Sequence, residues 1–104
     1  MKMKPNNYEN KNNVHITDLR NIGLLGTCKQ ISGNLNTACG MNTGFYMGQN
    51  LQNSPSNSNF WFFIIHLVHN PTYMKQIAFS FNDDNMYVRS QIDGSWTTWK
   101  TYTP

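Results

Sequence analysis

The sequence predicts an all-β fold: a small antiparallel sheet, built as a meander or sandwich-like knob, behind an irregular N-terminal lead-in. The first observation is the stretch Phe60–Tyr102, which contains four strand-like runs separated by turn residues. The second is the abundance of Asn and the scarcity of Leu and Ala, which disfavour long helices and favour turns. The third is an aromatic content of 13%, which supplies bulk for a small core. A chain of 104 residues is long enough for one small domain.

The first 41 residues predict no long element. Residues 1–13 are rich in Asn and Lys and show no apolar periodicity. They predict a flexible tail or, alternatively, an attachment segment that orders against a partner chain. Residues 14–41 predict an irregular lead-in with one or two short elements, suited to oligomerisation or docking. The apolar residues between Val14 and Leu25 mark either a turn or a short amphipathic helix within it.

Residues 42–104 form the predicted β-rich knob domain, which begins with a short strand at Thr43–Gly48. A polar loop follows at Gln49–Asn59, where Pro55 opposes strand formation. The next strand, Phe60–His69, is apolar on both faces for most of its length, which predicts a central strand covered on both sides. One face is expected to meet the core of the domain, and the other either the lead-in or a neighbouring subunit.

The remaining strands alternate more clearly and are joined by hairpin signals. Tyr73–Phe81 is followed by the loop Asn82–Asn85, whose Asn and Asp residues tolerate left-handed backbone. Met86–Ile92 is the next strand, and Asp93–Gly94 is a strong signal for a hairpin into a last strand at Trp96–Tyr102. Consecutive hairpins of this kind predict an antiparallel meander.

Composition argues against several classes of function. The net charge of +3 comes from scattered cations and not from a basic stripe, which argues against nucleic-acid binding. The longest apolar run, Phe60–Val68, is far shorter than the ~20 residues of a membrane helix, so no membrane insertion is expected. Cys28 and Cys39 are expected to be free thiols, although a disulfide between them is geometrically allowed. No cofactor and no metal site are predicted, since no ligand spacing is present.

Catalysis is not expected. The adjacent carboxylates Asp83 and Asp84 lie in a predicted turn and point apart, so turn formation is their expected role. His66 and His69 are three apart on a strand, which places them on opposite faces, and each is expected to be a hydrogen-bonded structural histidine. We therefore predict that the protein is not an enzyme and has no catalytic residues.

Aromatic residues are the one surplus in the sequence. Most are expected in the core. Trp96 and Trp99 are three apart, so in a regular strand they face opposite ways unless a bulge realigns them. An exposed Trp or Tyr beside loops rich in Asn and Asp would suit sugar binding, through ring stacking and planar hydrogen-bonding groups.

The order of motifs TGFYMG, SPS, FWFFIIHLVH, YMKQIAFSF and MYVRSQIDGSWTTWKTY resembles the pyocin-knob domain of phage and R-type pyocin tail fibres. The resemblance covers Asn42–Tyr102, and its most specific parts are GFY, Gln76, YVR and GSWTTWK. It implies a β-rich knob at or near the distal end of a homotrimeric fibre that binds a host-surface receptor, usually a cell-wall or envelope glycan. It also implies location in the virion after synthesis in the host cytoplasm. Other phage tail proteins are the expected partners of the N-terminal segment.

Three functional hypotheses follow from this resemblance. The first is a receptor-binding knob. The alternative is a structural tail protein whose knob caps or docks other virion components without receptor binding. A polysaccharide depolymerase is the third, and it would need carboxylates assembled from Glu9, Asp18, Asp83, Asp84 and Asp93. Gln76 and Arg89 are expected to hold the sheet together. The candidate receptor-binding residues, chosen for expected exposure and chemistry, are Tyr73, Asn82, Asp83, Asp84, Asn85 and Trp96.

Overall fold

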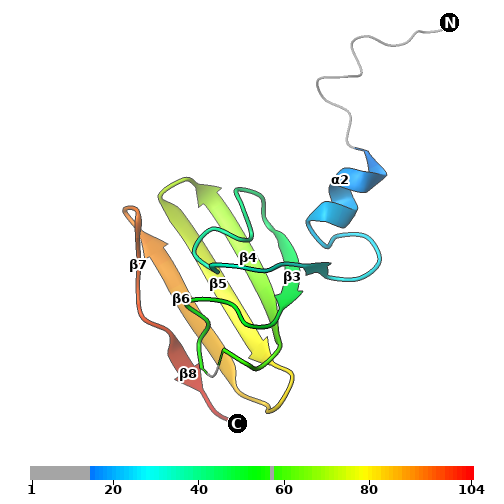
Figure 1. Cartoon of the computed structure of the whole chain (residues 1–104). Coiled ribbons are helices and arrows are strands. Elements are labelled where there is room, and N and C mark those ends of the chain that lie inside the picture. Colours follow the sequence, from blue (N-terminus) through cyan, green and yellow to red (C-terminus); the bar gives the residue numbers. More distant parts are fainter. Residues whose placement is uncertain (1–14, 57) are drawn as a thin grey trace, which may run out of the picture.

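The main feature of the computed structural model is one open sheet of seven strands (Figure 1). The structure describes residues 15–56 and 58–104. The all-β prediction is confirmed. Residues 1–13, predicted as a tail, lie outside the described residues. The described elements are helix α2 (Ile16–Asn21) and strands β2 (Lys29–Gln30), β3 (Gly44–Gly48), β4 (Phe62–Asn70), β5 (Tyr73–Ser80), β6 (Met86–Ile92), β7 (Ser95–Trp96) and β8 (Lys100–Tyr102).

The predicted antiparallel meander is confirmed from β3 to β7, where each strand pairs with the next along the chain. The turn between β6 and β7 has positive φ at Asp93 and Gly94, as a two-residue hairpin requires. Strand β2 adds a parallel partner to β3, which the sequence analysis did not predict. The sheet is therefore mixed, with β4 and β5 near its centre.

The last strand differs from its prediction. The expected continuous strand Trp96–Tyr102 is divided into β7 and β8, which pair with opposite halves of β6. Thr97 makes the break, because its amide donates to the Ser90 carbonyl at 2.8 Å while its hydroxyl accepts from the Ser90 amide at 3.0 Å. A hydroxyl that replaces a carbonyl as acceptor interrupts the regular ladder.

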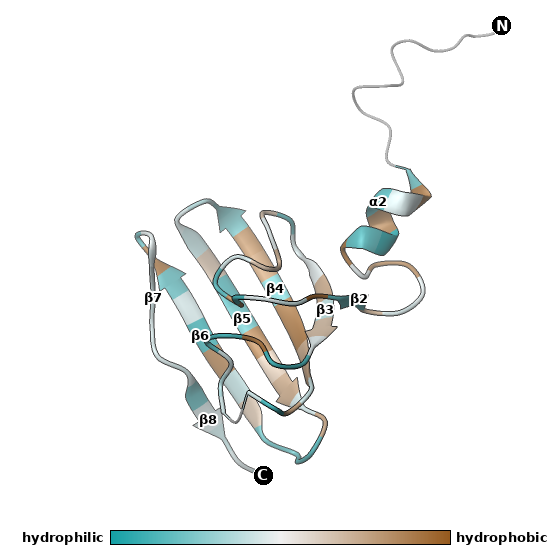
Figure 2. Cartoon of the chain, in the orientation of Figure 1, coloured by the Kyte–Doolittle hydropathy of each residue, from teal (hydrophilic) through white to brown (hydrophobic). Residues whose placement is uncertain are grey.

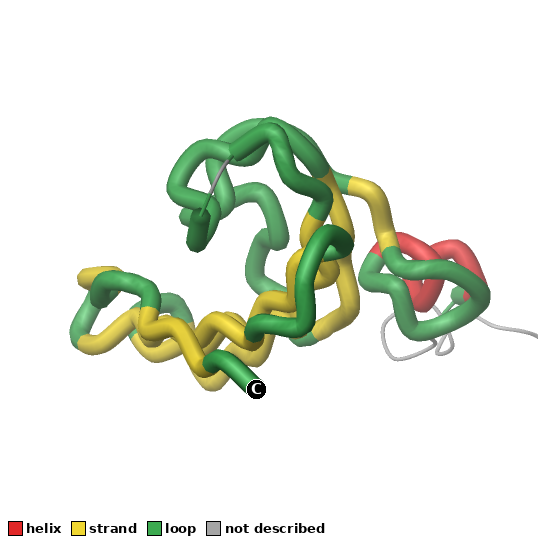
Figure 3. The backbone as a smooth tube through the Cα atoms, turned by 90° about the horizontal axis from the view of Figure 1, so that it is seen from below, coloured by secondary structure: helices red, strands yellow, loops and turns green. Residues whose placement is uncertain are grey.

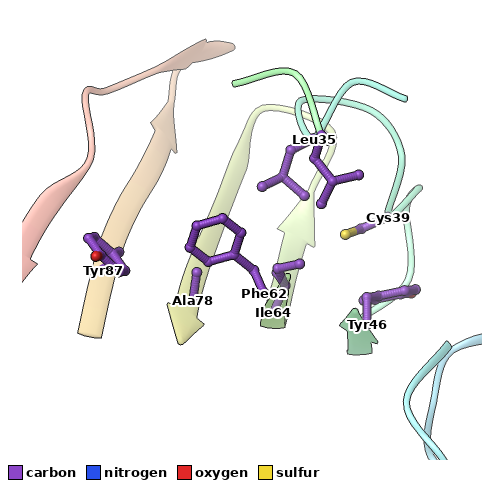
Figure 4. Packing of buried hydrophobic residues seen from close by; sticks show 8 residues of the cluster. Leu35, Cys39, Tyr46, Phe62, Ile64, Ala78 and Tyr87 are labelled. Carbon is purple, nitrogen blue, oxygen red and sulfur yellow. The ribbon is translucent and has the colours of Figure 1, made fainter. Parts of the chain in front are cut away.

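One face of the sheet is covered by the loops between β2 and β4, and this is where the core lies (Figure 4). Leu35, Cys39 and Leu51 come from these loops and pack on strand residues that alternate along the sheet. Leu35 and Cys39 belong to the predicted lead-in, so this part of the lead-in is integral to the core. The strand residues of the cluster are Tyr46, Phe62, Ile64, Ala78 and Tyr87. The prediction that one face of the central strand meets the core is confirmed. The two cysteines are free, as predicted.

Figure 3 shows the loops between β2 and β4 gathered on one side of the sheet. At the opposite face, the segment from Arg20 to Gln30 lines a groove with Met47, Phe63 and Phe81. We call this second surface the open face. Figure 2 shows that β3 and most of β4 are apolar, whereas apolar and polar residues alternate along β5 and β6. Helix α2 does not cover this face: it lies beyond the β2–β3 edge and buries none of its residues (Figure 1). The outward residues of the central strands are Phe45, Met47, Phe63, Ile65, Leu67, Tyr73, Lys75, Ile77, Phe79, Met86, Val88, Ser90 and Ile92.

A close backbone contact joins the segment of α2 to the sheet. The amide of Phe45 donates to the Ile22 carbonyl at 2.7 Å. Gly23 follows with φ of +73°, and a Cβ at this position would overlap the Phe45 carbonyl oxygen. Glycine therefore serves two purposes here, left-handed backbone and close approach. The helices in the described part of the chain are all too short or too polar to cross a membrane.

Candidate functional site

The structure places the predicted receptor-binding residues in three separate places. Asn82–Asn85 form the turn between β5 and β6. Tyr73 and Trp96 lie near the other end of the sheet, where Met74 pairs with Gln91 and Gln91 pairs with Trp96. These two are themselves separated, because Tyr73 lies on the open face and Trp96 on the covered face. The six residues therefore do not form one site within a single chain.

The Asn82–Asn85 turn is held by its own side chains. The Asp83 carboxylate accepts a hydrogen bond from the Asn85 amide at 2.9 Å, and the Ser80 hydroxyl accepts one from the Asn82 amide at 2.9 Å. These are the local bonds by which Asn, Asp and Ser stabilise turns. The turn-forming role expected for Asp83 is confirmed.

The two tryptophans of the last segment meet at one side chain. The Arg89 guanidinium carbon lies 4.1 Å from the ring centroid of Trp96 and 4.7 Å from that of Trp99. The two rings were expected on opposite faces unless an irregularity realigned them, and the interruption between β7 and β8 is such an irregularity. The Trp99 indole also donates to the Asn53 carbonyl at 2.9 Å, which ties the residue before β8 to the covering loop between β3 and β4.

Arg89 is the centre of a buried polar network. The side chain is only 5% exposed. Its Nε donates to Gln76 Oε1 at 2.9 Å, and its Nη1 donates to Asn36 Oδ1 at 2.7 Å. Both acceptors are neutral amides, and burial lowers the pKa of Arg89 to about 10. The guanidinium therefore stays cationic at neutral pH without a carboxylate among these acceptors.

Gln76 and His66 extend this network across the sheet. Gln76 Nε2 donates to the Leu35 carbonyl at 3.1 Å and lies 3.2 Å from His66 Nδ1. His66 Nε2 lies 3.0 Å from the Gly40 carbonyl. A carbonyl only accepts, so we assign the imidazole proton to Nε2 and the acceptor role to Nδ1. Burial lowers the pKa of His66, which favours this neutral form. The structural roles expected for His66, Gln76 and Arg89 are confirmed.

Cys39 is not placed for nucleophilic chemistry. It is 5% exposed within the apolar core. Burial raises the pKa of its thiol to about 12, with only partial opposition from the positive charge of Arg89. The thiol is therefore protonated at neutral pH and acts as a small apolar side chain. In residues 15–56 and 58–104, no three His, Cys, Asp or Glu side chains are grouped to hold a metal ion.

A groove of about 440 Å³ lies beside the Arg89 network, and we call it the tryptophan groove. It combines aromatic surface with amide and hydroxyl groups. Nearby, Arg89 Nη2, Gln91 Oε1 and Trp96 Nε1 are buried without a hydrogen-bond partner in the described part of the chain. The groove is lined by Asn36, Asn53, Ser54, Pro55, Arg89, Trp96, Thr97, Thr98 and Trp99.

Sequence reasoning selected Trp96 but missed the other residues of this groove as a site. Asn36 and Asn53 come from the irregular covering loops, far in sequence from Arg89. A polar residue in such a loop has no periodicity that would reveal what it faces. The sequence pointed to this groove only through the motifs GSWTTWK, which contains Trp96 and Trp99, and YVR, which contains Arg89.

Comparison with known proteins identifies the group to which the chain belongs. Residues 6–102 match the family described as the XkdV N-terminal domain, which covers nearly the whole chain. Neither a curated protein nor a solved structure matches the chain. The family consists of phage tail structural proteins, which agrees with the tail origin implied by the sequence resemblance. The chain therefore belongs to the XkdV N-terminal domain family and is a structural component of a phage tail.

Proposed function

We propose that this tail domain binds a host-surface glycan in the tryptophan groove, without catalysing a reaction. The observation that supports the proposal is the gathering of two indoles, two asparagines and three hydroxyl residues around one groove. Sugar rings stack on aromatic surfaces, and their hydroxyls pair with amides and hydroxyls. Of the six predicted receptor contacts, only Trp96 lines this groove. The proposed contacts are therefore Trp96 and the other residues that line the groove.

The resemblance to the pyocin-knob domain supports the same role. In this proposal the domain is a knob of a homotrimeric tail fibre, synthesised in the host cytoplasm. The N-terminal segment would contact other tail proteins. Tyr73 and the Asn82–Asn85 turn lie away from the groove and would touch the receptor only if it were extended or bridged neighbouring copies.

A binding assay with groove variants tests the proposal. Thr98 is an exposed groove residue, and Thr98→Arg would narrow the groove without altering the Arg89 network. We expect this variant to reduce binding of the full chain to host cell-wall glycans at least tenfold. Asn82→Arg, in the turn between β5 and β6, is the matched control and should bind as the wild type does. The proposal fails if Asn82→Arg abolishes binding while Thr98→Arg does not, or if the wild-type chain binds no glycan.

A second candidate function is supported by a different observation, the open face of the sheet. A structural tail protein that only joins other virion components would need an apolar surface of this kind. Electron microscopy of the phage particle distinguishes the two functions. A domain enclosed on all sides by other tail proteins would favour the structural role, and an outward-facing tryptophan groove would favour receptor binding.

A further inference from the structure

The open face is unusually apolar and unusually exposed for a single chain. Phe63 is 45% exposed, Phe45 is 41% exposed and Phe79 is 37% exposed, although all three lie on ordered strands. Ile65, Ile77 and Val88 lie among them and are only partly buried. Scattered apolar residues are normal at a protein surface, whereas a contiguous patch marks a surface that another molecule covers.

The area of this patch reaches the size of a specific interface. Seven large side chains on or beside the face are 37–54% exposed: Phe45, Phe63, Leu67, Tyr73, Phe79, Phe81 and Ile92. A fully exposed aromatic side chain has an accessible area of about 150–250 Å². At the exposed fractions above, each of the seven side chains keeps roughly 80 Å² accessible, or roughly 600 Å² in total. Two such faces in contact would bury roughly 1,200 Å², which is the lower bound for a stable protein–protein interface.

Aromatic rings are concentrated at one side of the open face. Phe63 and Phe81 are stacked with ring centroids 4.2 Å apart, and Trp61 stacks on Phe81 at 6.1 Å. Phe63 and Phe81 line a groove of about 760 Å³, whose other lining residues include Arg20, Leu25, Lys29 and Met47. Stacked aromatic residues beside a recess are typical of the anchors that dominate binding energy at interfaces.

The charges around the open face lie at its margins, and two of them, Arg20 and Lys29, line the groove at the β2–β3 edge. Lys75 is near the end of β5 that leads from the Tyr73 turn, and Lys100 pairs with Val88 at the outer β8 edge. The outward residues of the central strands include no carboxylate. An uncharged centre with polar residues at the rim is the usual anatomy of a protein interface.

The remaining parts of the chain do not suit this surface. Helix α2 lies beyond the sheet edge and buries none of its residues, and only its Arg20 lines the groove beside Phe63. Residues 1–14 contain five Asn, three Lys and one Glu, with few apolar residues to place against the aromatic patch. The occupant must therefore bring its own apolar surface of matching size.

We infer that a second copy of this chain covers the open face, so that the sheets of two copies pack face to face. The copy supplies an apolar surface of the required area and has no charge at its centre to bury. Stacked sheets pack about 10 Å apart with interdigitated side chains, which would enclose Phe63, Ile77 and Phe79 of each copy. This inference does not depend on glycan binding, which is proposed for the covered side of the sheet.

Measurement of the mass of the full chain in solution tests the inference. We expect sedimentation at micromolar concentration to give a mass of two chains. A mass of three chains would overturn the face-to-face pairing, because a pair already covers both open faces. Phe79→Glu would bury an unpaired carboxylate in the interface, so it should weaken association at least a hundredfold. Ile16→Glu introduces the same charge at a residue of α2 that is 58% exposed, and it should leave the mass unchanged.

Two controls keep the result interpretable. Circular dichroism should show that Phe79→Glu is folded, and the milder Phe63→Ser should weaken association if Phe79→Glu is not. A wild-type chain that remains monomeric at 100 µM or more would overturn the inference and leave another tail protein as the occupant. Association that survives Phe79→Glu and Phe63→Ser equally would also overturn it, because the contact would then lie elsewhere. Glycan binding measured on the same samples reports separately on the proposed function.

Discussion

Replacing Arg89 with lysine should destabilise the domain strongly, although the positive charge is kept. Arg89 uses a planar fork to reach Gln76 and Asn36 at once, while its plane lies against Trp96 and Trp99. A lysine ammonium is a point charge on a flexible chain and cannot reproduce this arrangement. Arg89→Lys therefore changes the geometry of the side chain while its positive charge is kept.

The magnitude follows from the contacts that lysine would lose. A hydrogen bond to a charged group contributes about 1.5–3 kcal/mol, and a cation–π contact contributes about 0.5–2 kcal/mol. Lysine could keep one of the two hydrogen bonds, so we expect a loss of about 2–4 kcal/mol in the free energy of unfolding. For a domain of this size, that lowers the melting temperature by roughly 10–25 °C.

Thermal and urea denaturation followed by circular dichroism would measure this loss. Wild type and variant must be compared at one protein concentration, because self-association raises apparent stability. Lys29→Arg is the matched control, since Lys29 is exposed and the exchange there should cost less than about 0.5 kcal/mol. An Arg89→Lys protein within about 0.5 kcal/mol of wild type would refute the view that the fork geometry organises the network.

Two further predictions concern His66 and Gly23. Burial lowers the pKa of His66, so below a pH of about 6.5 the unfolded chain binds a proton that the native state does not, and the free energy of unfolding should fall as the pH falls. Urea denaturation between pH 5 and 8 should show a weaker dependence for His66→Gln than for the control His69→Gln; equal dependence in both variants would contradict the argument. At Gly23, alanine would meet the Phe45 carbonyl as well as unfavourable left-handed backbone, so Gly23→Ala should cost more than about 2 kcal/mol. Gly26→Ala has a similar φ of +83° and open space around it, so it should cost only about 1 kcal/mol; equal melting temperatures for the two variants would show that the close contact is unimportant.

The strands of the sheet could be predicted because their signals are local. Alternation of side chains along Tyr73–Ser80 and the turn residues Asp93–Gly94 depend on neighbours a few positions away. The prediction failed at Trp96–Tyr102, where every residue favours a strand. There the bonds between Thr97 and Ser90 decide the path of the chain, and a pairing between separate segments leaves no periodic pattern.

The sequence by itself determined the class of fold, the order of the hairpins and the two apolar faces of the strand that begins at Phe62. This was possible because successive side chains of a strand point to opposite faces, so a buried face shows as an apolar residue at every second position. Only the tertiary structure decided which face is covered and where the functional groups meet. Asn36 and Asn53 reach Arg89 and Trp99 across long separations in the chain, and such contacts depend on how loops return over the sheet. The apolar residues of the open face were visible in the sequence, but their exposure became apparent only once the covering loops were found on the opposite side.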